Sequence, residues 1–143
     1  MDNRSEVMLR VLMNRYPGAQ TFRFGDSEAL CAELTALVLA GKKTATCMAN
    51  VEVEQGTEAM PEVGRRDIAL HWDGRPALVI ETESVRLVPY NEVDADFALA
   101  EGENTTLEGW RDDHRRYFER TVGFDESMLL ICERFSVVEI LEP

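Results

Sequence analysis

The stretch ALVLAGKKTAT, residues 36–46, carries the signals of a helix end followed by the start of a strand. Upstream of it, apolar residues recur at helical spacing from Leu30 to Val38. Gly41 suits the left-handed conformation that commonly ends a helix. Residues 44–51 then alternate small apolar with polar residues, which is typical of a strand. The stretch therefore predicts a helix, a turn with two lysines, and a strand that begins with hydroxyl groups.

On both sides of this stretch, further strand and helix signals alternate along the chain. Strand signals occur at residues 68–72, 77–88, 128–132 and 135–141. Helix signals occur at residues 7–12, at residues 91–100, and behind a Thr-Thr-Leu-Glu capping box at residues 105–108. This mixture predicts an α+β fold, with a small curled sheet or barrel of about five to six strands and helices packed outside it.

Length and composition fit one globular domain. The chain has 143 residues, of which 45% are hydrophobic and 29% are charged, so disorder of the whole chain is not expected. Three widely spaced cysteines without a CxxC motif favour buried thiols over a disulfide framework. The sequence predicts neither a signal peptide nor a membrane span. We therefore expect a cytoplasmic protein with no membrane partner.

The net charge of -12 limits the class of ligand. Long RNA is attracted mainly through Lys and Arg contacts to its phosphates, and an acidic chain disfavours such binding. A neutral nucleoside is not disfavoured.

Motifs for cofactors and metals are absent from the sequence. There is no phosphate-binding GxxxxGK[ST] loop, no GxGxxG, and no DNA-specific motif. The two histidines and three cysteines show no zinc-ligand spacing. We therefore expect no cofactor and no metal.

Lys42 and Lys43 have two interpretations. Lysines near a helix C-terminus interact favourably with the helix dipole, which is a structural role. A lysine with a lowered pKa acts instead as a base toward a hydroxyl, and Thr44 and Thr46 supply hydroxyls. In a regular strand Lys43 and Thr46 point to opposite faces, so a functional pair requires a bend or a strand that begins after Lys43.

A second polar segment, Glu101-Gly102-Glu103-Asn104, precedes the capping box. It is a solvated turn in the simpler interpretation; in the other, one carboxylate points into a pocket as a general acid or base. Trp110 and His114 follow one turn apart on an apolar helix face. Core packing of Trp110 and a satisfied buried imidazole are favoured over base stacking and catalysis. We expect the two polar segments to meet at one concave pocket.

Together, the two segments resemble the signature of the ASCH family. The resemblance rests on residues 36–46 and on Ala100-Glu101-Gly102-Glu103-Asn104, followed by Leu107, Trp110, Arg111 and His114. It leaves residues 1–20 as an N-terminal helix and residues 21–143 as the ASCH domain. The resemblance implies a β-barrel related to the PUA fold and a role connected with RNA.

The resemblance also implies a catalytic set. Some small bacterial ASCH proteins are N(4)-acetylcytidine amidohydrolases with a Thr–Lys–Glu set, which matches Thr46, Lys43 and Glu103. In that scheme Lys43 takes a proton from Thr46 or from water, and Glu103 passes a proton to the departing amine. Substrate contacts are then expected from neighbouring polar residues: Lys42, Thr44, Glu101, Asn104, Arg111 and His114.

Other activities of the family stay open for this chain. Some longer ASCH proteins are described as ribonucleases, and many have Gly-Glu-Gly-Asp where this chain ends the motif with Asn104. The amide in place of an acid weakens a second carboxylate role, including metal binding. The expected partner is a small-molecule nucleoside or RNA, bound by an amidohydrolase, a ribonuclease or a non-catalytic module. A homodimer is also left open.

Overall fold

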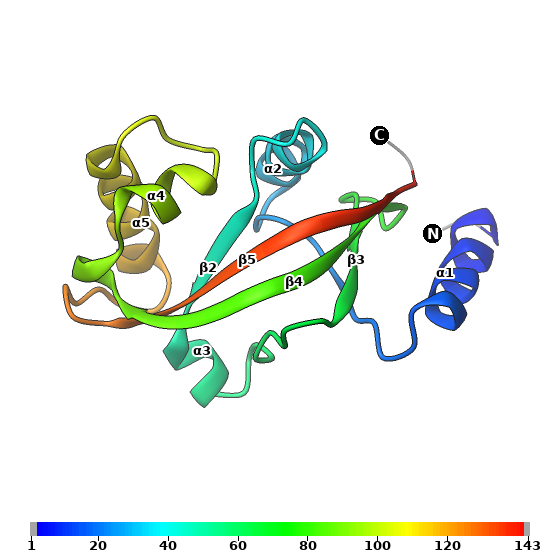
Figure 1. The fold of residues 1–143 in the computed structure, drawn as a ribbon, viewed down its shortest axis with the longest axis horizontal. Coiled ribbons are helices and arrows are strands. Elements are labelled where there is room, and N and C mark those ends of the chain that lie inside the picture. Colours follow the sequence, from blue (N-terminus) through cyan, green and yellow to red (C-terminus); the bar gives the residue numbers. More distant parts are fainter. Residues whose placement is uncertain (1–2, 142–143) are drawn as a thin grey trace.

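The computed structural model describes residues 3–141 and has an α+β fold (Figure 1). Its helices are α1 (Asn3–Arg15), α2 (Glu28–Leu39), α3 (Asn50–Glu54), α4 (Ala95–Ala100) and α5 (Leu107–Arg120), with a 3-10 helix at Tyr90–Glu92. Its strands are β1 (Thr21–Phe22), β2 (Ala45–Ala49), β3 (Arg66–Leu70), β4 (Pro76–Pro89) and β5 (Leu129–Ile140). The predicted fold class and strand number are confirmed.

The strands form one curled sheet in the order β1-β3-β4-β5-β2. The short β1–β3 pair is parallel, and the other neighbours are antiparallel. The β4–β5 register shifts between Val79 and Ile80 and again between Thr82 and Ser84. Such bulges bend a strand and increase its twist, so the two long strands curve around the core. Because β1 and β2 stand at the ends of this order, the described strands form a barrel-like sheet without hydrogen-bonded closure.

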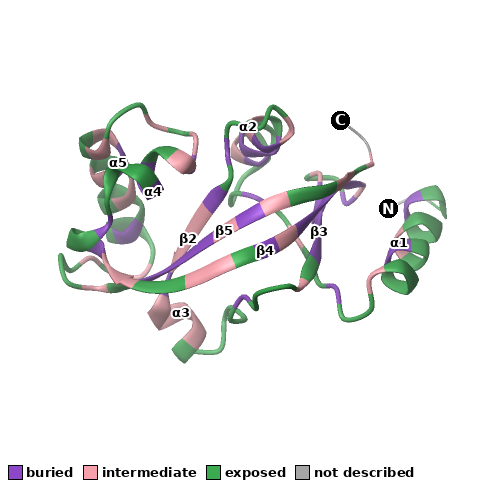
Figure 2. Ribbon diagram, in the orientation of Figure 1, coloured by how far each residue is buried: buried purple, intermediate pink, exposed green. Residues whose placement is uncertain are grey.

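Helices bury three apolar clusters against the sheet (Figure 2). Trp110 of α5 is completely buried among residues of α4, β2 and β5, which confirms its predicted core position. Val38 of α2 packs against β3, β4 and β5, and Leu12 of α1 packs against β3 and β4. The first cluster places α4 and α5 beside the start of β2, where the lysine pair lies.

Three local elements differ from the sequence expectations. The two C-terminal strand candidates form a single strand, because Glu133 between them is buried and accepts a hydrogen bond from Thr82 Oγ1 at 2.8 Å. The predicted helix at residues 91–100 is split between the 3-10 helix and α4. The N-cap of α5 is Thr106, whose hydroxyl accepts the Gly109 N–H at 3.0 Å. A glycine at this third helical position has no side chain to complete a capping box.

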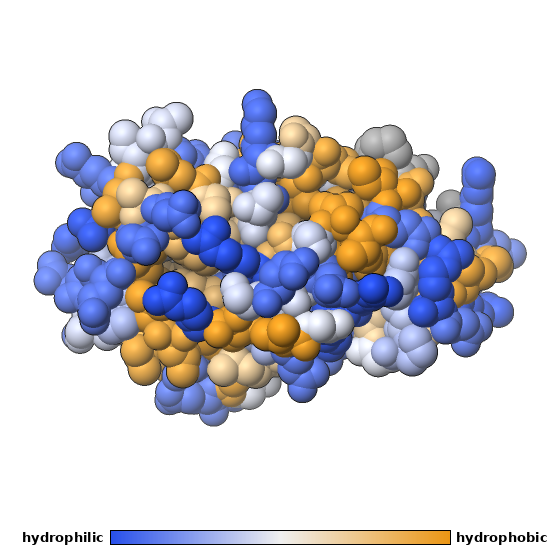
Figure 3. All heavy atoms as spheres, in the orientation of Figure 1, coloured by the Kyte–Doolittle hydropathy of each residue, from blue (hydrophilic) through white to orange (hydrophobic). Residues whose placement is uncertain are grey.

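The described surface includes an exposed apolar patch. Figure 3 shows apolar side chains gathered over the C-terminal part of β5, where Val137, Val138 and Ile140 are exposed. The homodimer left open by the sequence stays a prediction. Within residues 3–141, none of the helices has the length and apolar character that crossing a membrane requires.

Candidate active site

The two polar segments singled out in the sequence meet through their backbones. The Thr44 N–H donates to the Ala100 carbonyl oxygen at 2.8 Å. Gly102 has a φ of +80°, and a Cβ placed there would lie 2.5 Å from the carbonyl oxygen of Lys42. Only glycine accepts both this left-handed conformation and such a close approach. The expectation that the segments meet is confirmed, and Gly102 makes the contact sterically feasible.

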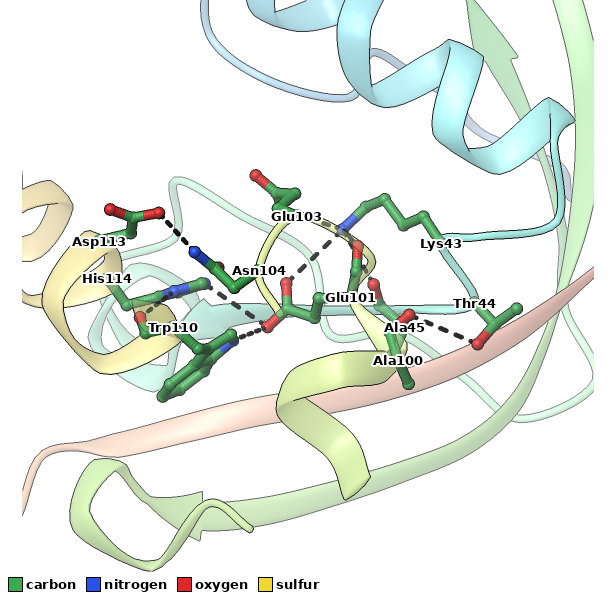
Figure 4. A network of polar contacts seen from close by, with 10 residues as sticks. All are labelled: Lys43, Thr44, Ala45, Ala100, Glu101, Glu103, Asn104, Trp110, Asp113 and His114. Atoms are coloured by element: carbon green, nitrogen blue, oxygen red, sulfur yellow. Dashed lines mark hydrogen bonds and ion pairs between the residues drawn. The ribbon is translucent and has the colours of Figure 1, made fainter. Parts of the chain in front are cut away.

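Lys43 is buried at this junction, with 2% of its surface exposed. It precedes β2, which begins at Ala45. Its Nζ donates to the Ala45 carbonyl oxygen at 2.9 Å and lies 3.4 Å from Glu103 Oε2 and 3.6 Å from Glu101 Oε1 (Figure 4). A cation withdrawn from water requires partners of this kind. The interpretation as a solvated lysine at a helix end therefore fits the exposed Lys42 but not Lys43.

Glu101 connects Lys43 to the core of the protein. Its Oε2 accepts the indole N–H of Trp110 at 2.7 Å and lies 3.5 Å from His114 Nε2. Burial raises the pKa of the Glu101 carboxyl, but the polar contact and charge of His114, the charge of Lys43 and the Trp110 bond lower that pKa below its usual value overall. Glu101 is thus a buried anion held by three groups.

His114 lies on the opposite side of Glu101 from Lys43. Its ring stacks on Trp110, with centroids 4.1 Å apart and planes 22° from parallel. Its Nδ1 lies 2.9 Å from the Trp110 carbonyl oxygen, which can only accept, so Nδ1 carries the hydrogen. Burial lowers the pKa of His114, but the contact and charge of Glu101 outweigh this effect and raise the pKa above its usual value. The arrangement fits the satisfied imidazole that the sequence favoured.

Thr46 lies on the other face of β2. Its neighbour Cys47 packs against the Trp110 cluster, so Thr46 points to the opposite side of the strand. There it pairs across the sheet with Glu133 of β5. Burial raises the pKa of the Glu133 carboxyl, which accepts the Thr82 hydroxyl. The sequence analysis did not single out Glu133 as a buried acid. The available signal was an acidic residue next to the apolar run of a predicted strand.

A single peptide group relates Lys43 to Thr46. Lys43 Nζ donates to the carbonyl oxygen of Ala45, which belongs to the peptide that joins Ala45 to Thr46. Lys43 and Glu103 are therefore in direct contact (Figure 4), while Lys43 is related to Thr46 through the backbone carbonyl of Ala45.

Three of the remaining predicted substrate residues lie beside the junction of the two polar segments. Thr44 is exposed, and its Oγ1 lies 3.4 Å from the Ala100 carbonyl oxygen that also binds its N–H. Asn104 Nδ2 donates to Asp113 Oδ2 at 2.8 Å, which ties the second segment to α5. These residues and Lys42 border the junction.

Arg111 does not lie at this junction. It lines a separate groove of about 520 Å³ with Tyr90 and Phe124, and its buried Nε has no hydrogen-bond partner among residues 3–141. Because this groove is lined by neither lysine, a concave pocket formed by the two polar segments stays a prediction.

One set of side chains at the site has the atom types and proximity of metal ligands. Cys47 Sγ, a carboxylate oxygen of Glu101 and a ring nitrogen of His114 all lie within 4.8 Å of one another. Burial raises the pKa of the Cys47 thiol well above its usual value, and the charge of Glu101 adds to this effect.

The family can be assigned from a direct match. The family model described as the ASCH domain matches residues 20–139. The chain belongs to the ASCH family. This result confirms the resemblance found in the two polar segments, and it supports an RNA-related role for the protein at a general level.

Two solved structures are similar to this ASCH protein along nearly its whole length. An ASCH domain from Lactobacillus crispatus JV V101 is 34% identical with a TM-score of 0.83, and the alignment covers 97% of this chain and 96% of that one. A protein from Enterococcus faecalis V583 is 32% identical with a TM-score of 0.84, and the alignment covers 98% of this chain and 91% of that one. No curated protein sequence matches the chain.

Proposed function

We propose that this ASCH protein is an amidohydrolase that removes the acyl group from N(4)-acylated cytidine. The observation that carries the proposal is the buried ammonium of Lys43, 3.4 Å from Glu103 Oε2. Its other carboxylate neighbour, Glu101, is fully enclosed, whereas the Glu103 side chain is 28% exposed. Glu103 is therefore the carboxylate of this pair that an entering substrate can reach.

The chemistry required is the addition of water across an amide. An oxygen nucleophile attacks the acyl carbonyl carbon, the bond from that carbon to N4 breaks, and N4 leaves as the amine of cytidine after receiving a proton. The Lys43–Glu103 pair accepts the proton from the attacking oxygen and returns it to N4. Thr46 supplies a hydroxyl next to the peptide that Lys43 binds, and we assign it to the attacking or water-positioning role. If the Thr46 oxygen attacks, the acyl group forms an ester with it, and water then hydrolyses that ester, releasing the carboxylic acid and restoring the hydroxyl.

The charge distribution favours a nucleoside over a long RNA as the substrate. A net charge of -12 opposes attraction of a polyphosphate chain. Asn104, which stands where many of the ribonuclease members have an acid, is held by Asp113 and adds no carboxylate to the site. We therefore place ribonuclease activity and simple RNA binding second.

The test is turnover of a panel of N(4)-acylated cytidines, with an unstructured RNA as a parallel substrate and products separated by chromatography. We expect release of cytidine by the wild type and a loss of at least about 100-fold for Glu103→Gln, the scale on which general acid–base catalysis contributes. Glu108→Gln is the matched control, because Glu108 is an exposed acid in the first turn of α5.

Two results would remove this function. Absence of turnover for every acylated cytidine would leave the binding-module alternative in front. Cleavage of RNA that depends on Glu103 would assign the same residues to the ribonuclease alternative.

A further inference from the structure

The Cys47–Glu101–His114 set brings together three groups that can each bind a metal ion, with their ligand atoms within 4.8 Å of one another. The Nε2 of His114 and the Oε2 of Glu101 are 3.5 Å apart, beyond the usual 2.7–3.2 Å range of an N–H···O bond. Tetrahedral zinc with bonds of about 2.0–2.3 Å holds its ligand atoms about 3.3–3.6 Å apart. The observed separation therefore matches two ligands of one ion.

The nitrogen ligand and the oxygen ligand are each held in place by a second hydrogen bond, as metal ligands in proteins usually are. His114 donates Nδ1–H to the Trp110 carbonyl oxygen, which leaves Nε2 free to face Glu101. A metal-binding histidine almost always has its other nitrogen fixed by such an acceptor. The indole N–H of Trp110 fixes Glu101 Oε2 at 2.7 Å. One residue, Trp110, thus positions both ligands.

An added divalent cation fits the local charge when it takes the place of a proton on His114. Around Lys43, the carboxylates of Glu101 and Glu103 outnumber the single ammonium when the imidazole is neutral. A divalent ion together with a Cys47 thiolate adds one positive charge and balances this excess. The set joins soft sulfur to nitrogen and oxygen, a combination that suits zinc better than magnesium or calcium.

The geometry points to a zinc site formed by Cys47 Sγ, Glu101 Oε2 and His114 Nε2, with a fourth position open. This inference goes beyond the proposed amidohydrolase function and does not depend on it. On binding, the Cys47 thiol gives its proton to solvent as the sulfur–metal bond forms, so affinity should rise with pH. Ligation leaves Oε1 of Glu101 paired with Lys43 and adds an electrophile one carboxylate away from the proposed proton-transfer pair.

The test uses the untagged full chain and two probes. Equilibrium dialysis against Zn²⁺ measures stoichiometry and affinity, and titration with Co²⁺ reports sulfur ligation through a near-ultraviolet thiolate-to-cobalt charge-transfer band. We expect one equivalent of Zn²⁺ and the cobalt band in the wild type. Cys47→Ser should lose the band and weaken Zn²⁺ binding by more than about 100-fold, since even outer-shell changes cost 10–100-fold.

The chain supplies its own matched control. Cys31 is a buried free cysteine that contacts the Leu70 carbonyl oxygen instead of the site, so Cys31→Ser should bind both ions like the wild type. A wild type without the cobalt band overturns the site, whatever the variants do. Zn²⁺ binding that survives unchanged in folded Cys47→Ser also overturns it, because the ion then lies on surface carboxylates. Both outcomes are independent of acylcytidine turnover.

Discussion

Replacement of Lys43 by methionine tests the buried cluster directly. Methionine has nearly the same length and fills the same space, so the change removes the charge and its hydrogen bond but leaves little cavity. The side chains of Lys43 and Glu101 are 2% and 3% exposed. Loss of the ammonium therefore leaves an anion in a site that water does not reach.

The expected cost follows from the partners that remain. Removal of one member of a buried ion pair typically destabilises a protein by about 3–5 kcal/mol. Glu101 keeps the Trp110 bond and the His114 contact, so we expect the lower end, about 3 kcal/mol. At about 2–4 °C per kcal/mol for a chain near this size, Tm should fall by about 6–12 °C.

Chemical and thermal unfolding of four variants would check this value: Lys43→Met, Lys42→Met, Glu101→Gln and the double variant at residues 43 and 101. Lys42→Met is the control, because Lys42 is exposed and its loss should change the free energy of unfolding by no more than about 0.5 kcal/mol. Lys43→Met combined with Glu101→Gln should be no less stable than Lys43→Met alone, since the uncompensated charge is gone. The reasoning fails if Lys43→Met is as mild as Lys42→Met, or if the two site changes are simply additive.

Three further outcomes are expected. Gly102→Ala should destabilise the protein by at least about 2 kcal/mol and Gly123→Ala by only about 1 kcal/mol, because both have positive φ but only the first Cβ meets a backbone atom, 2.5 Å away; equal costs in denaturant titrations would contradict this. The pKa of His114 is raised in the folded protein, so His114 stabilises the fold fully below its usual pKa of 6.5, and this stabilisation is lost as the pH rises through the folded pKa. The pKa of Glu101 is lowered, so Glu101 stabilises the fold above its usual pKa of 4.5, and this stabilisation is lost as the pH falls through the folded pKa. Urea unfolding between pH 5.5 and 8.5 should thus show stability falling with pH in the wild type and a weaker fall in His114→Gln. Binding to long RNA should be weak and fall steeply with salt; tight binding that survives high salt would show that the net charge of -12 misled us.

Local signals predicted the parts of the fold that local physics determines. The apolar spacing of α2, the glycine that ends it and the alternation of β2 each depend on neighbours in sequence, and the structure has all three. The placement of Trp110 in the core followed from helix periodicity in the same way. The continuity of β5 through Glu133 did not, because the hydroxyl that satisfies this acid comes from Thr82 on another strand.

The site was predictable as a pair of segments but not as a set of contacts. Alternation indicated that Lys43 and Thr46 can form a functional pair only if the strand begins after Lys43, and β2 does begin after it, at Ala45. The role of Glu101 could not be predicted from the sequence, because its partners come from the turn before β2 and from α5. The same holds for Cys47, which packing between β2 and α5 brings within reach of His114.

The turn at Gly102 gives the two glutamates different positions, and this difference explains why only one of them fits a chemical role. Its φ of +80° and its contact with the Lys42 carbonyl turn the chain sharply between them. Glu101 is directed into the core, where Trp110 and His114 fix it. Glu103 contacts the same Lys43 ammonium but stays partly exposed to solvent. A group that is fixed by three partners can hold Lys43 in place but is poorly suited to exchange protons with a substrate. In the proposed mechanism the proton therefore passes between Lys43 and the substrate through Glu103, and this makes Glu103→Gln the most direct probe of that proposal.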